Sequence, residues 1–486
     1  TIMIQRNRNV LTGLAFAILS LALLLSAPKG CSGVPLEPWH TEKLFEEFTR
    51  EKSEEVNSFA EYQALEERLF KQLDEKVYAR SETGPGHNLD RYSPGSAADP
   101  RQQQPDWNRS FELTTDQPRG AILLLHGMSD SPYALHSLGL TLNKNNYRVL
   151  GMRMPGHGTT PSGLRNITRH DMAAAVRLGM DHLGKQMNGK PVHIIGYSTG
   201  ASLALEFTLD ALEGAAAPIP ASLVLISPAI GVHPSAAMAG IKDSLGNLPG
   251  LSGLAFLEVR PEFDPYKYNS FATNAANVVH GLTRSVSNRI RSRADTNPEF
   301  VLPPVIVFKS TVDATVTTNA VVDILLNRLK PDRHELVLFD INRYAVVKSR
   351  LIIDDPAPLT DRLMNDDKLP FTVTLVTNES EESTRVISKE KMPFSARTVN
   401  RRLLDQAWPP GVISLSHVAL PFSPDDTLYG QRAPDNDDFL FLGQMAIQGE
   451  RGLLQIPTDW LLRLRYNPFY DFLEQHTIEW IDNANG

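Results

Sequence analysis

The chain has 486 residues, more than one compact core usually contains, so we expect a main domain with extensions or insertions. Hydrophobic residues make up 42% and charged residues 21%, as in ordinary globular proteins. The net charge of −8 is spread along the chain without the lysine- and arginine-rich run of a nucleic-acid binder, and a single cysteine, Cys31, excludes an internal disulfide and a cysteine-based zinc site.

Residues 1–31 are predicted to be a signal peptide or a membrane anchor. Arg6 and Arg8 precede an uncharged, apolar stretch at residues 10–28, an order that is typical of export signals. A buried core helix is the alternative, but the basic flank and the position in the chain favour export. The pattern leaves open whether the segment is cleaved, retained or lipidated at Cys31. It predicts an exported or membrane-anchored protein, in the periplasm or cell envelope if the protein is bacterial.

Residues 32–107 are predicted to form a helical extension followed by a linker. Between residues 41 and 82 the sequence is rich in charges, and apolar residues such as Leu65 and Leu69 recur at steps of three and four. Helices with one apolar stripe need a packing partner. We therefore expect the extension to pack against the main domain, with a coiled-coil partner as the alternative. Proline, glycine, serine and glutamine dominate residues 85–105, as in a linker or surface loop.

Residues 108–486 are predicted to form the main domain, in which apolar strands alternate with helices. After an edge strand at residues 108–113, the predicted buried strands lie at residues 121–125, 148–152, 192–195, 222–226, 305–309 and 335–339. The predicted helices begin near residue 131 and after residue 198, or span residues 170–187 and 317–329. Because each strand is a continuous run of apolar residues, the pattern predicts an α/β fold with a doubly wound, mostly parallel sheet. In such sheets ligands bind at the carboxyl ends of the strands.

Two long segments interrupt this alternation. Residues 233–300 lack a buried strand and are rich in alanine, leucine, asparagine and phenylalanine, so we predict a helical lid. Residues 343–410 are predicted to be a late insertion that contains a hairpin. The remaining predicted elements are the hairpin strands at residues 371–377 and 384–388, a short strand at 412–415 and a C-terminal amphipathic helix at 457–481.

The sequence Gly196-Tyr197-Ser198-Thr199-Gly200 lies between an apolar strand and a helix rich in alanine and leucine. A serine at the apex of a strand-to-helix turn has a strained backbone, and glycines two residues on either side keep the turn tight. The first turn of the helix favours negative charge beside Ser198. The pentapeptide alone arises by chance in about one chain in six of this length. Its placement is what indicates an acyl-transfer nucleophile.

A serine nucleophile needs a general base, and the base needs a carboxylate that fixes its tautomer. On folds with this turn, the partners follow in the order serine, acid, histidine. His334 precedes a predicted strand and therefore lies at the wrong edge of the sheet, and His476 belongs to the terminal helix. His417 follows a predicted strand at the correct edge, so we predict His417 as the general base.

Asp313 is predicted to be the acid, because it follows the strand at residues 305–309. A helix N-cap is its alternative role, and Asp340 after the next strand is the rival acid. The oxyanion needs two N–H donors. We expect these donors to be the backbone groups of Thr199, directly after the nucleophile, and of Met128, in the loop after the strand at residues 121–125.

Together the segments 126–133, 155–158 and 196–200, with Asp313 and His417, resemble the α/β-hydrolase superfamily, nearest to its lysophospholipase and monoacylglycerol-lipase-like serine hydrolases. The Pro-Gly-His-Gly loop at residues 155–158 is similar to that of monoglyceride lipases, except that Arg153 or Met154 replaces a preceding acidic residue. The resemblance covers residues 119–341 and the His417 loop. It does not cover the N-terminal extension or the late insertion.

The resemblance implies a serine hydrolase that cleaves carboxylic esters by a Ser198, His417 and Asp313 mechanism without a metal or organic cofactor. An apolar acyl chain is expected, because the superfamily resemblance favours it and the predicted lid supplies apolar side chains. Those side chains are Leu251, Leu254, Phe256, Leu257 and Phe271. A serine peptidase or amidase on the same triad and a non-catalytic membrane-associated scaffold are the two alternatives.

Overall fold

The computed structural model describes residues 35–231, 255–297, 300–313, 316–331, 333–344, 352–433, 440–443 and 463–485. The predicted export segment and Cys31 lie outside these residues, so that prediction stays a prediction. Within the described ranges, none of the helices combines the length and the apolar character that a bilayer crossing requires.

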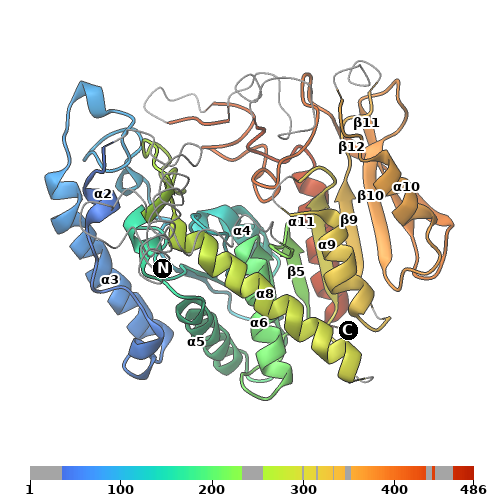
Figure 1. Ribbon diagram of the computed structural model, residues 1–486, viewed down its shortest axis with the longest axis horizontal. Helices are drawn as coiled ribbons and strands as arrows, with labels where there is room; N and C mark the ends of the chain where they lie inside the picture. The colour runs from blue at the N-terminus through green and yellow to red at the C-terminus, as the bar shows by residue number, and fades with distance from the viewer. Residues whose placement is uncertain are drawn as a thin grey trace, which may run out of the picture.

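Ten strands of the described chain form one sheet in the order β1-β3-β2-β4-β5-β8-β9-β10-β11-β12. Figure 1 labels β5 and β9 to β12 of this sheet. Neighbouring strands from β3 to β10 are parallel. They are β2 Gly120–Leu125, β3 Tyr147–Met152, β4 Val192–Tyr197, β5 Leu223–Ile226, β8 Val305–Ser310, β9 Glu335–Phe339 and β10 Thr372–Asn378. Antiparallel strands border this group, with β1 Phe111–Leu113 at one edge and β11 Arg385–Lys391 and β12 Thr398–Ala407 at the other. The predicted α/β fold with a mostly parallel sheet is confirmed.

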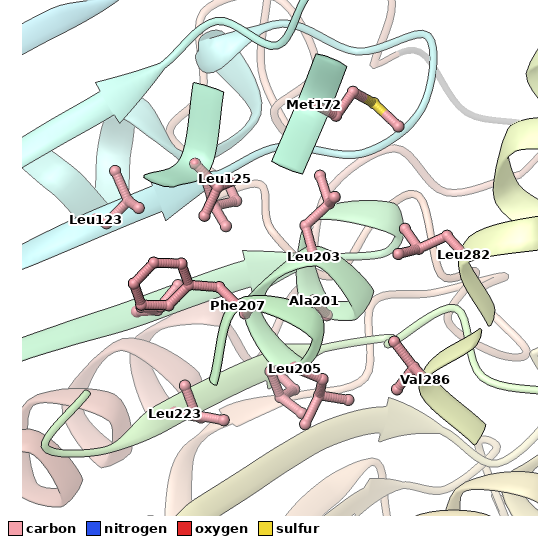
Figure 2. Packing of buried hydrophobic residues seen from close by; sticks show 14 of the residues in the cluster. Leu123, Leu125, Met172, Ala201, Leu203, Leu205, Phe207, Leu223, Leu282 and Val286 are labelled. Carbon is pink, nitrogen blue, oxygen red and sulfur yellow. The ribbon is translucent and has the colours of Figure 1, made fainter. Parts of the chain in front are cut away.

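Helices cover both faces of the sheet because successive strand residues point to opposite sides. Leu123 and Leu125 of β2 pack in one cluster with Met172 and Leu203 (Figure 2). Ile122 and Leu124 pack in a second cluster on the other face. The first face is covered by α5 Arg169–Met187, α6 Thr199–Leu212 and α8 Thr273–Thr296, and the second by α4 His136–Lys144 and α11 Tyr470–Ala484. Both faces of the sheet are therefore buried, as the continuous apolar strands predict.

The N-terminal extension packs against the helix layer of the main domain. It contains α2 Pro38–Thr41 and α3 Phe59–Lys76, and a capping box between Ser58 and Glu61 starts α3. Three side chains of α3, Phe59, Tyr62 and Leu65, belong to the same buried cluster as the strands. Between α2 and α3 the chain is irregular apart from one 3-10 turn, so the helical prediction for this part is wrong. Leu44, Phe48 and Val56 of this irregular segment are nevertheless buried, whereas Phe45 is exposed.

The late insertion extends the main sheet. Residues 343–410 contain α10 Ala357–Asn365, and β10 and β11 form the predicted hairpin. β10 pairs in parallel with β9, so the sheet continues into this segment. β12 was not predicted, because its side chains are mostly exposed and show no apolar alternation.

Other elements differ from the sequence prediction in detail. The predicted lid contains the two-stranded pair β6 Phe256–Glu258 and β7 Phe271–Ala272, followed by α8. The predicted helix at 317–329 is divided into α9 Thr318–Ala320, a π turn Val321–Leu325 and a 3-10 turn Leu326–Arg328. The predicted strand at 412–415 is wrong, since only Val412 forms a bridge. The other 3-10 turns are Arg50–Glu54, Tyr78–Arg80, Pro85–His87, Pro100–Gln102, Pro132–Leu135 and Pro161–Arg165.

A buried ion-pair cluster joins the extension to the sheet. Arg153, directly after β3, is fully buried and pairs with Glu66 of α3 at 2.8 Å and with Glu47 at 2.9 Å. Ser110 donates a hydrogen bond to Glu66, and the Tyr62 hydroxyl donates one to the Arg153 carbonyl. Burial raises the pKa of Glu66, and the neighbouring Arg153 opposes that shift. Each charged side chain of this cluster is therefore stabilised in its ionised form by the opposite charge that lies beside it.

We expect Arg153→Met to lower the free energy of unfolding by about 3 to 5 kcal/mol, because it leaves buried carboxylates without their cation. Urea denaturation of the full chain measures the change. The control is Arg68→Met, which breaks an exposed pair with Glu46 and should cost less than about 1 kcal/mol. Equal losses in the two variants would contradict the structural role of the buried cluster.

Candidate active site

Ser198 lies at the apex of the turn between β4 and α6. Its backbone has a φ of 53° and a ψ of −114°, a strained combination for a residue with a side chain. A Cβ at Gly196 would lie 2.5 Å from backbone atoms of Ala201, and a Cβ at Gly200 would overlap the Leu125 carbonyl. The two glycines therefore allow the close approach of β4, α6 and the end of β2 that this turn requires.

Two backbone N–H groups lie in the elements from which oxyanion donors are expected. Thr199 is the first residue of α6, so its N–H has no acceptor within the helix. Met128 is buried in the loop after β2. These positions follow neighbouring parallel strands and lie on the same edge of the sheet as Ser198.

His126 joins the loop of Met128 to the loop after β3. Its Nδ1 lies 2.9 Å from the Gly127 carbonyl, and its Nε2 accepts a hydrogen bond from the Met154 backbone at 3.0 Å. Burial lowers the pKa of His126 to about 3, so the ring is neutral and can accept at Nε2. This role of His126 was not predicted from the sequence, although the position of a histidine directly after a buried strand indicated it.

Asp313 and His417 lie together at the carboxyl edge of the sheet. The distance between His417 Nδ1 and Asp313 Oδ1 is 3.7 Å, slightly longer than a hydrogen bond. The Val316 backbone donates a hydrogen bond of 3.2 Å to the same carboxylate oxygen, and Lys309 Nζ lies 2.8 Å from the other. Burial lowers the pKa of His417 to about 4, and the charge of Asp313 opposes that shift. The imidazole is therefore neutral near pH 7, as a general base must be.

The sheet order places Ser198 near this pair. Ser198 follows β4 and Asp313 follows β8, and β5 is the only strand between them in the described sheet. Two strand spacings correspond to roughly 10 Å, a gap that an imidazole between the two residues can bridge. The structure thus brings His417 to Asp313 and places both on the sheet edge that carries Ser198.

The rival residues have other partners. Asp340 accepts hydrogen bonds from Arg343 at 2.9 Å and from Thr377 at 2.8 Å. His334 accepts one from the backbone at the start of β8, at the opposite edge of the sheet. His476 of α11 lies 3.0 Å from Glu335, at the same opposite edge. These contacts agree with the choice of Asp313 and His417 over the rivals.

The structure describes three of the five apolar side chains of the predicted lid, and among them Leu257 is half-buried. Phe256 is fully buried in the main core cluster, and Phe271 packs against that cluster. Leu251 and Leu254 lie outside the described residues. The apolar spacing of this segment thus reflects core packing at Phe256 and Phe271.

Lys309 and Arg153 are two further residues of this region whose roles were not predicted from the sequence. Each is a cation at or next to the end of a buried apolar strand, where an unpaired charge would be costly. A cation in or next to an apolar strand was therefore the feature of the sequence that indicated a buried ion pair. The carboxylates that neutralise it come from other elements or from the following loop, so the partners could not be named in advance.

Comparison with known proteins gives matches over part of the chain. Residues 116–270 match the family model Hydrolase_4, described as serine aminopeptidase, S33. An 84-residue stretch is 31% identical to a thermostable monoacylglycerol lipase of Bacillus sp. (strain H-257), covering 17% of this chain and 33% of the lipase. A 163-residue stretch is 28% identical to the magnesium-chelatase 30 kDa subunit of Rhodobacter capsulatus, covering 33% of this chain and 47% of that protein.

Among solved structures, one described as LipS and LipT, two metagenome-derived lipolytic enzymes, has 18% identity and a TM-score of 0.39. That match covers 48% of this chain and 88% of the solved chain. The two curated relatives are matched over about a third and about half of their own lengths. The sheet order and the strained serine turn are those of an α/β-hydrolase fold, and over part of its length the chain is similar to the Hydrolase_4 family and to a monoacylglycerol lipase.

Proposed function

We propose that this protein is a serine hydrolase that cleaves carboxylic esters. The observation that supports the proposal is that the strained Ser198 turn and the Asp313 and His417 pair lie at the same edge of the sheet, with 3.7 Å between His417 Nδ1 and Asp313 Oδ1. A strained nucleophile, a neutral imidazole and an acid at one sheet edge are the parts of an acyl-transfer site.

In the proposed reaction, Ser198 Oγ attacks the ester carbonyl while His417 accepts the hydroxyl proton. The carbonyl oxygen becomes an oxyanion, which accepts hydrogen bonds from the Met128 and Thr199 N–H groups. Collapse of this intermediate breaks the bond to the alcohol, which leaves with the proton from His417. Water then attacks the acyl-Ser198 in the same way and releases the carboxylic acid, and Asp313 stabilises the protonated imidazole in both halves.

The proposed substrate is an ester with an apolar acyl chain. This proposal is supported by the monoacylglycerol lipase among the matched relatives. The described residues of the predicted lid give no further support for an apolar acyl chain. A serine aminopeptidase is the second candidate, because the matched family model carries that description. Both reactions use the same triad, so the leaving group distinguishes them.

We expect Ser198→Ala to abolish labelling by a fluorophosphonate probe and to lower kcat for a p-nitrophenyl ester by a factor on the order of 10⁶. The control is Ser202→Ala, one turn further along α6, whose hydroxyl donates to the Ala229 carbonyl. That variant should keep its labelling. An unlabelled, inactive wild-type protein would indicate the non-catalytic scaffold. Parallel assays on p-nitrophenyl esters and aminoacyl amides separate an esterase from a peptidase.

We expect kcat/KM to fall with decreasing pH through about 4, because His417 acts as a base only when it is neutral and its pKa is lowered to about 4. A pH profile of ester hydrolysis measures this limb, and a limb near the ordinary value of 6.5 would contradict the buried setting.

Circular dichroism at each pH is the required control, because burial also lowers the pKa values of His126 and His157 to about 3. The unfolded chain binds protons near pH 6.5 and the folded chain does not, so stability decreases as the pH falls below that value.

Export or membrane anchoring through residues 1–31 is also part of the proposal, and rests on Arg6, Arg8 and the apolar stretch that follows. We expect the full chain in its host cell to be recovered in the membrane or outside the cytoplasm. Deletion of residues 1–31 should move it to the cytoplasmic fraction. An unchanged distribution of the shortened chain would contradict the prediction.

A further inference from the structure

Lys309 is a buried cation inside an apolar strand. Every residue of β8 is buried, and the Lys309 side chain has no exposed surface. Burial of an ammonium group is costly unless an anion and hydrogen-bond acceptors compensate for the lost water. A lysine in this place therefore requires a compensating interaction, and its partner is the carboxylate of Asp313.

The contacts of the Lys309 ammonium group hold the carboxylate of Asp313 in place. Its Nζ lies 2.8 Å from Asp313 Oδ2 and donates to the Val316 carbonyl. The Val316 N–H returns a hydrogen bond of 3.2 Å to Asp313 Oδ1, the oxygen that lies 3.7 Å from His417 Nδ1. One carboxylate oxygen is thus held by the ammonium group, while the other faces the imidazole.

We propose that Lys309 is a positioning residue for the hydrolase site, because it keeps the buried Asp313 carboxylate ionised and oriented toward His417. The proposal rests on the proposed function, in which His417 needs an ionised acid. Without the ammonium group, a carboxylate in this buried setting would take up a proton more readily. A protonated Asp313 would stabilise the imidazolium less well, and the reaction would be slower.

Other charges near the pair must be considered in a pH experiment. The charged side chains that act on His417 are Asp313, Arg463, Lys267 and Lys309, and the field of Asp313 also reaches Tyr197 at the end of β4. Lys267 is paired with Asp130 at 2.6 Å. Removal of Lys309 removes a positive charge from His417 as well as from Asp313. Both effects move the acid limb of the activity toward higher pH.

The test is the pH profile of p-nitrophenyl ester hydrolysis and of fluorophosphonate labelling for the full-length Lys309→Met variant. We expect the acid limb to move upward by about one pH unit or more. At pH 7 we expect kcat to fall about 10-fold to 100-fold, a smaller loss than the roughly 10⁴-fold loss caused by disabling a triad acid. Lys309→Arg, which keeps the charge, should recover part of kcat and return the limb toward the wild-type position.

Two further variants separate positioning from a structural role. In the Asp313→Asn background, which lacks the carboxylate charge, Lys309→Met should cause no further loss of kcat at pH 7. Any further upward shift of the acid limb should be smaller than in the wild-type background, because only the charge that acts directly on His417 is removed. Lys185→Met is the matched control, because Lys185 and Asp181 form an exposed ion pair of 2.6 Å with the same four-residue spacing. Its profile should equal that of the wild type.

A Lys309→Met protein that keeps the wild-type acid limb would overturn the proposal, whether its activity is unchanged or lower at every pH. An equal further loss in the Asp313→Asn background would overturn it as well. A wild-type protein that neither reacts with the fluorophosphonate nor cleaves the ester refutes the proposed function instead. The failures of the two proposals are therefore distinguishable.

Discussion

The close approach of β4, α6 and the end of β2 at Ser198 is the constraint on which the site depends. The backbone of Ser198 is strained, and the free energy that maintains it comes from the buried sheet and helices on either side. A side chain at Gly200 would overlap the end of β2, and a side chain at Gly196 would contact the start of α6. Packing thus positions Ser198, so the polar groups around it are not needed to hold the turn and can take part in the proposed reaction.

Much of the fold could be predicted from the sequence because the central strands are buried on both faces. Runs of valine, isoleucine and leucine identified β2, β4 and β8, and β9 was placed at its observed bounds. β12 was missed for the opposite reason, since most of its side chains face solvent. The irregular segment before α3 was mistaken for a helix, because a loop that follows a core can bury residues at helical spacing.

The candidate site was predictable to the extent that it follows from topology. Ser198, Asp313 and His417 were chosen from chain order and sheet edge, and the structure brings the last two together. Their joint role as a triad stays a prediction until activity is measured. Lys309 could not be assigned, because its proposed function depends on the position of a carboxylate four residues later, beyond the end of β8. Contacts of this kind are decided by tertiary geometry.

The ion pairs of Arg153 constrain the order in which the chain can fold. Arg153 is 106 residues from Glu47 and 87 residues from Glu66, so both acids leave the ribosome well before their cation. The extension packs α3 against α5 and against the residue that follows β3, and both are synthesised after it. It cannot acquire its native packing during its own synthesis, and must wait until the first half of the sheet exists. The native packing of the extension therefore depends on residues that come later in the chain.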